Sequence, residues 1–330
     1  MPFISPFATE LFWFDRDVDR FRPALDVATL APWCQRALGS PPRRELFESG
    51  YLSQVLGVEL DDGRRVVVKV RPWADRLVAC ARVHGALFDA GFPCPQPVTG
   101  VDELDGWAVS AEALVPDYAQ LPPAADSPRL FAEALAQLVD VARLAPVDAA
   151  TLHPSPPWAD WDDPSRRDLW PEPDDRPIDL NQLAATWVDA AAGTVREWLL
   201  QRPAPVVVGH LDWYSANVGW RDRRLVAVFD WDSIGAQPEP AIAGLAAAVW
   251  PTTDDPGEGA TVEQSHQFLA AYANARAWSD SDLTMAWTAG LWVRCFDAKK
   301  ATAIGDDPET VITKSEVRQR LRLAGLPDDL

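Results

Sequence analysis

The pattern of apolar and polar positions divides the chain into a first part rich in short strands and a second part rich in helices. Short β-type runs bounded by turn residues occupy 46–60, 65–70, 98–101 and 107–115. Apolar residues recur at helical spacing over further segments, 25–38, 74–90, 128–144, 179–201, 241–250, 261–278, 280–302 and 314–324. This order favours a β-rich unit followed by a mainly helical one.

A polar motif interrupts the helical part between positions 206 and 234. Three β-type runs, 206–208, 217–220 and 225–229, are separated by polar turns. The turns carry four chemically informative side chains, His210, Asp212, Asn217 and Asp230. Asn217 follows Asp212 by 5 positions, and Asp230 follows Asn217 by 13. A carboxylate, an Asn in the same loop and an Asp after a hairpin are the polar groups of a kinase site.

The sequences HLDWYSAN at 210–217 and DWD at 230–232 resemble a known pair of motifs. They are similar to HGDxxxxN and DxD/E of the aminoglycoside phosphotransferases and their choline-kinase-like relatives. Leu211 replaces the usual Gly, which changes the freedom of the loop but keeps the polar side chains in register. The alternative is a surface turn that is merely rich in Asp and Asn.

The resemblance implies roles for the polar residues of this motif. Asp212 is expected to orient or deprotonate an acceptor hydroxyl, and His210 to brace the loop. Asn217 and Asp230 are expected to hold Mg²⁺, and Asp232 to hold a second metal ion or orient Asp230. Such oxygen ligands suit a hard cation that keeps positions for phosphate and water.

Lys69 lies in the strand RVVVKV at 65–70. A buried Lys needs an anionic partner, because burying an unpaired charge is costly. In the kinase interpretation Lys69 reaches the α and β phosphates of ATP; the alternative is an outward-facing Lys on an edge strand. The turn at 48–53 is expected to cover the phosphates with its backbone N–H groups and with Ser49, Gly50 and Ser53; the alternative is a plain hairpin turn.

The resemblance implies a protein-kinase-like α+β fold of two lobes with ATP between them. We expect a β-rich lobe over 1–118, a helical lobe over 119–330 and a hinge at 112–118. The backbone of three hinge residues is expected to pair with adenine: Glu112, Ala113 and Leu114. Kinase-like folds place a Glu on the helix after the lysine strand, but 74–90 has none. His84 on that helix is expected to be a core residue or a neighbour of Lys69.

Two acidic or aromatic segments are candidates for acceptor binding. The Pro- and Asp-rich segment 145–178 carries three indoles, Trp158, Trp161 and Trp170. A long irregular segment is often a lid or a binding loop, and indoles stack on sugars or cations. The alternative is that they fix the loop to the helices beneath it. A second group, Asp254, Asp255 and Glu258, is expected to rim the acceptor site or to form a solvated acidic loop.

Composition narrows the partners. The net charge of −19 and the pI of about 4.5 argue against nucleic acid or an anionic membrane as a partner. Four cysteines show no metal-binding spacing, and no apolar run reaches the length of a membrane span. No secretory signal precedes the acidic start, so we expect a cytoplasmic protein. We also expect a monomer or a homodimer.

The sequence therefore predicts an ATP- and Mg²⁺-dependent phosphotransferase that acts on a hydroxyl of a small molecule. The resemblance implies an aminoglycoside, amino sugar, amino alcohol or similar acceptor. A nucleotide-binding pseudokinase without transfer activity is the alternative, motivated by the absent helix Glu. A kinase that repairs glycated lysine side chains is a third reading, which no residue demands.

Overall fold

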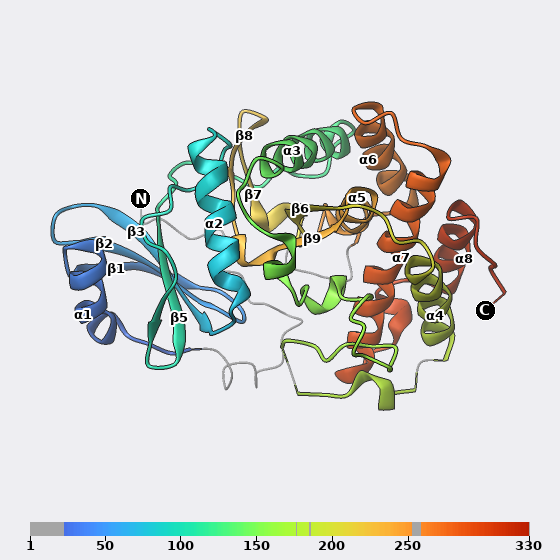
Figure 1. The fold of residues 1–330 in the computed structure, drawn as a ribbon, viewed down its shortest axis with the longest axis horizontal. Coiled ribbons are helices and arrows are strands. Elements are labelled where there is room, and N and C mark those ends of the chain that lie inside the picture. The colour runs from blue at the N-terminus through green and yellow to red at the C-terminus, as the bar shows by residue number, and fades with distance from the viewer. Residues whose placement is uncertain (1–22, 176, 185, 253–258, 330) are drawn as a thin grey trace.

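A five-stranded antiparallel sheet forms the first part of the protein (Figure 1). The computed structural model describes residues 23–175, 177–184, 186–252 and 259–329. The strands in spatial order are β1 (Pro42–Ser49), β2 (Gln54–Leu60), β3 (Arg65–Pro72), β5 (Trp107–Ala113) and β4 (Asp102–Leu104). The predicted strand at 98–101 is wrong; there, the N–H groups of Val98 and Thr99 both donate to the Ala111 carbonyl.

Alternate side chains of β3 point to the two opposite faces of the sheet. Val66, Val68 and Val70 are buried in a small aliphatic cluster between the sheet and helix α1 (Val27–Leu38). The residues between them point to the opposite face, because side chains alternate along a strand. Lys69 is one of these, and it lies opposite Ser110 of β5.

Helix α2 (Arg76–Asp89) packs with the second part of the protein rather than with the small cluster of the sheet. Four of its buried side chains belong to the larger hydrophobic cluster that the other helices form: Ala79, Cys80, Val83 and Leu87. Arg76 in its first turn donates to the carbonyl of Asp232 at 2.7 Å and to that of Ile234 at 2.5 Å. The helix therefore links the sheet to the helical part, as its place between the two in Figure 1 shows.

The second part consists mainly of helices around one large core. They are α3 (Ser127–Ala142), α4 (Thr186–Leu200), α5 (Glu239–Val249), α6 (Val262–Asn274), α7 (Asp280–Ala303) and α8 (Lys314–Leu323). The backbones of α5 and α7 approach closely, since a Cβ at Gly244 would lie 2.0 Å from the Ala286 carbonyl oxygen. None of the helices in the described ranges is both long and apolar enough to span a membrane.

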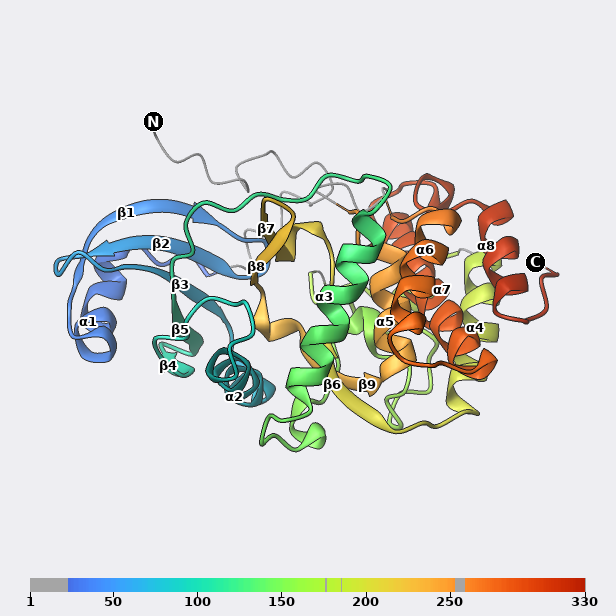
Figure 2. The ribbon, with the colours of Figure 1, turned by 90° about the horizontal axis from the view of Figure 1, so that it is seen from above.

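Two antiparallel strand pairs lie between the sheet and the helices (Figure 2). One pair is β7 (Val218–Arg221) with β8 (Arg224–Val228), and the other is β6 (Val206–His210) with β9 (Ile234–Pro238). Sequence analysis missed β9, whose sequence IGAQP shows no alternation. Its pairing sets Ile234 opposite His210 and so brings the two motif loops to one end of the pair.

Candidate active site

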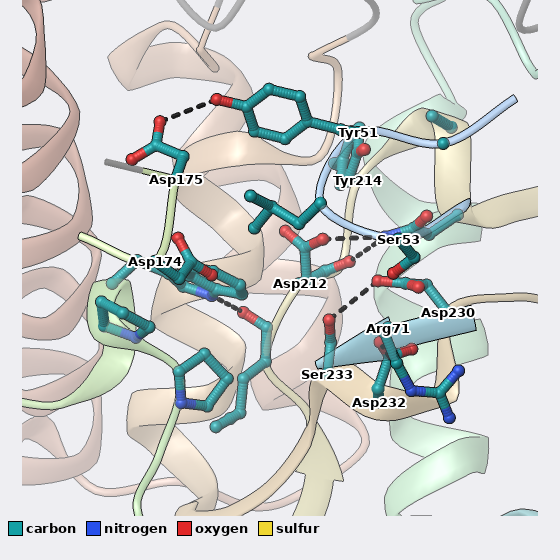
Figure 3. A pocket seen from close by; sticks show the side chains of 18 of the residues that line it. Tyr51, Ser53, Arg71, Asp174, Asp175, Asp212, Tyr214, Asp230, Asp232 and Ser233 are labelled. Carbon is teal, nitrogen blue, oxygen red and sulfur yellow. Dashed lines mark hydrogen bonds and ion pairs between the residues drawn. The ribbon is translucent and has the colours of Figure 1, made fainter. Parts of the chain in front are cut away.

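A cavity of about 1240 Å³ lies between the sheet and the helical part. Residues from both sides line it: Lys69 from β3, Asp212 and Asn217 from the loop after β6, and Asp230 and Asp232 from the segment before β9. Figure 3 shows the carboxylates of this group facing one another. Polar groups far apart in sequence are thus brought to one place.

His210 joins the two motif loops from a fully buried position. Its Nδ1 accepts the N–H of Asp212 at 3.2 Å, and its Nε2 lies 2.9 Å from the Phe229 carbonyl. Because Nδ1 accepts, the ring proton is on Nε2 and donates to Phe229. Burial lowers the pKa of His210 to about 4, so the ring is neutral at pH 7.

Leu211 stands at the position that is usually Gly in similar proteins, and the structure accommodates it. Its side chain packs over Gly235, where an added Cβ would lie 2.3 Å from Leu211 Cδ1. The backbone of Leu211 does not have a positive φ, so this turn does not need Gly. Its N–H donates to the Ser233 carbonyl at 2.9 Å, which ties the two loops together again.

Asn217 orients Asp212 within the loop. The Asn217 side-chain amide donates to the Asp212 carbonyl at 2.9 Å and to its carboxylate at 3.0 Å. Burial raises the pKa of Asp212 well above its usual value, and the charge of Asp230 raises it further. The loop therefore presents a carboxylate of raised basicity to the cavity.

Asp230 lies in the left-handed region, with φ of 60° and ψ of 55°. Its Oδ2 accepts the Ser233 hydroxyl at 2.9 Å. Burial and the negative charge of Asp232 raise the pKa of Asp230 to about 7. Burial alone would also raise the pKa of Asp232, but the cations Arg71 and Lys69 reverse this and lower it.

These residues fit a divalent cation that is shared with phosphate. The amide nitrogen of Asn217 is used by Asp212, which leaves its carbonyl oxygen for a cation. Asp232 Oδ1 is buried without a hydrogen-bond partner in the described part of the chain. That part holds no group of three or more His, Cys, Asp or Glu suited to a metal. A site of two carboxylates and an amide matches a cation that completes its shell with phosphate and water.

The partner of Lys69 is Glu112, on the neighbouring strand β5. The Lys69 ammonium lies 3.5 Å from the Glu112 carboxylate, and both side chains are nearly buried. Burial alone would lower the pKa of Lys69, but Glu112, Asp230 and Asp232 together raise it. Helix α2 has no Glu, and its one acidic residue, Asp89, is its last residue, so Glu112 is the carboxylate beside Lys69. His84 of that helix is a core residue, stacked on Trp231 with centroids 4.6 Å apart and bonded to the Pro95 carbonyl.

The prediction that adenine pairs with the backbone of 112–114 is corrected for two N–H groups. Glu112, Ala113 and Leu114 all line the cavity, and pairing of adenine with their carbonyl groups stays a prediction. The Ala113 N–H already donates to the Gln96 carbonyl at 2.8 Å, and the Leu114 N–H to the Arg65 carbonyl at 3.1 Å. Glu112 directs its side chain to Lys69. Sequence reasoning could not see this, because backbone pairing depends on the register of the sheet. The cavity wall continues at Val115.

The turn between β1 and β2 closes one side of the cavity. Ser49, Gly50 and Ser53 all line it. Gly50 is required there, since its φ is 105° and an added Cβ would lie 2.0 Å from the Ser53 carbonyl oxygen. The Tyr51 hydroxyl donates to Asp175 Oδ2 at 2.8 Å, and Lys300 of α7 lies 2.8 Å from the same oxygen (Figure 3). Sequence analysis missed this link across the cavity.

The three indoles of 145–178 have different roles. Trp158 lines the cavity and donates from Nε1 to the Leu211 carbonyl at 2.8 Å. Trp161 and Trp170 are buried against Trp292 of α7, with ring centroids 6.5 and 5.4 Å from it. The prediction that these two indoles contact substrate is therefore corrected: they fix the loop to the helix. Three further predicted residues, Asp254, Asp255 and Glu258, lie outside the described residues.

Several solved structures share the fold of this chain. The solved amicoumacin kinase hAmiN, in complex with AMP-PNP, Ca²⁺ and Ami, has a TM-score of 0.60 at 12% identity, covering 86% of this chain and 87% of that one. Aminoglycoside phosphotransferase APH(4)-Ia gives 0.58 at 13%, covering 90% and 99%. A choline/ethanolamine kinase family protein from Mesorhizobium loti gives 0.53 at 16%, covering 92% and 94%.

These likenesses confirm the predicted fold, a β-rich part joined to a larger helical part as in protein kinases. None of the curated proteins compared with the chain matches it. A family model described as "Phosphotransferase enzyme family" matches residues 43–278, which is most of the chain. The protein therefore belongs to this phosphotransferase family, APH, and is a small-molecule phosphotransferase.

Proposed function

We propose that the protein transfers the γ-phosphoryl group of ATP to a hydroxyl of a small molecule, with Mg²⁺ bound beside the phosphates. The observation that carries this proposal is the meeting of Lys69, Asp212, Asn217, Asp230 and Asp232 in one cavity. Phosphoryl transfer needs little covalent chemistry from the protein. It needs positioned charges and a group that orients the acceptor. The charged side chains of this cavity, with Asp212 for the acceptor, meet these needs.

Each polar residue has a place in this reaction. The Asp212 carboxylate, oriented by Asn217, accepts the proton of the acceptor hydroxyl. Asn217, Asp230 and Asp232 would hold the Mg²⁺, whose charge offsets that of the phosphates. Lys69 binds phosphate oxygens while Glu112 keeps its ammonium in place.

The nucleotide occupies the side of the cavity next to the sheet. The β1–β2 turn, with Gly50 and Ser53, covers the phosphates. Adenine pairs with the backbone at Val115, the cavity residue that follows the two engaged N–H groups of Ala113 and Leu114. AMP-PNP in the amicoumacin kinase structure supports a nucleotide of this kind.

The acceptor occupies the side next to the helices, where Trp158 and further carboxylates line the cavity. Asp174 and Asp297 line the cavity, and their charges help to raise the pKa of Asp212. Such a wall suits an alcohol that carries an amine, and APH(4)-Ia has been solved with hygromycin B. An aminoglycoside, amino sugar or amino alcohol is therefore the acceptor we propose.

The alternative of a nucleotide sensor loses its main support. It was motivated by the absence of a Glu on the helix at 74–90, but Glu112 holds the lysine instead. Asp212 and its orienting Asn217 are both present.

A turnover screen tests the proposal. Purified protein with Mg²⁺ and ATP is incubated with a panel of aminoglycosides, amino sugars and amino alcohols, and ADP release is measured against a no-acceptor control. We expect at least one acceptor to stimulate ADP release and to gain phosphate by mass spectrometry. Tight nucleotide binding without stimulation by any acceptor would favour the sensor.

A further inference from the structure

The cavity face of β3 carries a second cation that the proposed function does not use. Arg71 lies two positions after Lys69 and therefore on the same face of the strand. It lines the cavity, and only 8% of the residue is exposed. A guanidinium buried to this degree needs an acidic partner.

That partner is Asp232, in the segment that also carries Asp230. Arg71 Nε lies 3.5 Å from Asp232 Oδ2, and Nη2 donates to the Ser110 hydroxyl at 3.4 Å. Nε and Nη1 have no hydrogen-bond partner within the described ranges, and neither does Asp232 Oδ1. Figure 3 shows the two side chains next to each other. The pair thus holds one carboxylate oxygen and leaves the other unused.

The pair also joins the two parts of the protein. Arg71 belongs to the sheet, whereas Asp232 belongs to the short helical turn Trp231–Ser233 before β9. The backbone of the same turn is held from α2, because Arg76 donates to the Asp232 carbonyl. Asp232 is therefore held through its backbone by α2 and through its carboxylate by Arg71 of the sheet.

We propose that Arg71 is a positioning residue that fixes the Asp232 carboxylate for the metal and so couples the lysine strand to the metal-binding turn. The proposal rests on the proposed function, since it requires a nucleotide and a divalent cation in the cavity. In this proposal strand β3 couples the sheet to the metal site, whereas α2 has no Glu that could do so.

Nucleotide binding measured with and without metal tests this role. The dissociation constant of a fluorescent, non-hydrolysable ATP analogue is measured in Mg²⁺ and in EDTA. Arg71→Met is expected to weaken binding about 10- to 100-fold in Mg²⁺ and to leave binding in EDTA unchanged, because residues that orient metal ligands act through the metal. Asp232→Asn should behave in the same way, and the double variant should bind no worse than Asp232→Asn alone.

Two further variants keep the experiment interpretable. Arg71→Lys retains the charge and should restore part of the Mg²⁺-dependent affinity; it also serves if Arg71→Met does not fold. Arg44→Met breaks a similar pair with Glu59 on the exposed side of the same sheet and should change neither dissociation constant.

Three results would overturn the inference or its basis. Equal weakening in Mg²⁺ and EDTA would show that Arg71 contacts phosphate directly. A lower melting temperature with unchanged nucleotide affinity would show that its role is structural only. If the wild-type protein binds no nucleotide, the proposed function itself fails, and the inference fails with it.

Discussion

The sheet with α1 and the helical part differ in what holds them together and in what they contribute to the cavity. The small cluster of the sheet is mainly Val and Leu with one indole, Trp33. The larger cluster contains many indoles, among them Trp170 and Trp292, and it includes α2. The sheet supplies Lys69 and Arg71, and the helical part supplies Asp212, Asp230 and Asp232. The site is therefore complete only where the two parts meet.

Their contacts show which part controls which group. Lys69 pairs with Glu112 inside the sheet, so its position does not depend on α2. Arg71 and Tyr51 instead reach across to Asp232 and Asp175 of the helical part. The difference teaches that the lysine is preassembled, whereas the metal-binding turn and the phosphate-covering turn depend on the fit between the two parts.

The largest effect should come from Asp212, on the helical side. Asp212→Asn keeps the size of the side chain but removes the carboxylate that accepts the proton. We expect transfer to slow about 10²- to 10⁴-fold while the affinity for the nucleotide is retained, because Asp212 is assigned to the acceptor hydroxyl and not to the metal or the phosphates. Steady-state kinetics and nucleotide titration check this. A variant with near wild-type turnover would show that the proton has another acceptor.

Two buried indoles allow a test of whether α2 is stabilised by the helical part or by the sheet. Trp33 donates to Asp102 at 2.9 Å in the sheet part, and Trp170 donates to Asp189 at 2.8 Å in the helical part. Replacing either by Ala should lower the free energy of unfolding of its own part by about 3–5 kcal/mol. Hydrogen exchange should show α2 amides losing protection in Trp170→Ala and keeping it in Trp33→Ala. The reverse result would assign α2 to the sheet.

Low pH should weaken the contact between α2 and the turn at Trp231 through His84, the α2 residue that stacks on Trp231. Burial lowers the pKa of His84 to about 3 from its ordinary value of 6.5. Between these values the unfolded state binds the extra proton, so stability falls as the pH decreases from 6.5. The loss at pH 5 relative to pH 7 should be about 2 kcal/mol for this side chain. Denaturant melts of wild type and His84→Gln check it: the variant should show a shallower dependence on pH.

The smallest effect should come from the hydrogen bond between the phosphate-covering turn and the helical part. Tyr51→Phe removes the hydroxyl that donates to Asp175 and should weaken nucleotide binding about fivefold, or about 1 kcal/mol. Tyr272→Phe is the matched control, because its hydroxyl bonds Glu239 at 2.9 Å away from the cavity. It should lower stability without changing affinity. Equal affinities for both variants would show that Tyr51 does not hold the turn.

The sequence alone identifies site residues whose positions follow from their spacing along the chain. The end of β6 and the start of the DWD segment could be read from apolar runs, so Asp212 and Asp230 were found as candidate residues. The sequence does not identify the interaction partner of a side chain when that partner depends on the register of the strands. Lys69 lies opposite Ser110, and this places Glu112 within reach of the ammonium. The strand β9, which brings the two loops together, lacks the alternation that a sequence pattern needs.

The indoles show a different limit. Trp158, Trp161 and Trp170 have the same chemistry and occur in the same Pro-rich segment, yet only Trp158 lines the cavity. Trp161 and Trp170 are buried because they pack on Trp292 of α7. The sequence of the loop carries no information about this contact. Arg71 was overlooked for a similar reason, because its acidic partner is 161 positions away along the chain (232 − 71).

The anchoring of the long loop has a consequence for how acceptor preference can change. Trp161 and Trp170 fasten the loop to α7 at two points, and Asp163 and Arg166 between them line the cavity. Mutations confined to this interval can reshape the wall that meets the acceptor while the fasteners preserve the scaffold. A directed library over 163–168 that keeps Arg166, whose guanidinium pairs with the nearly buried Asp160 at 2.5 Å, can therefore sample new specificities at little risk to folding.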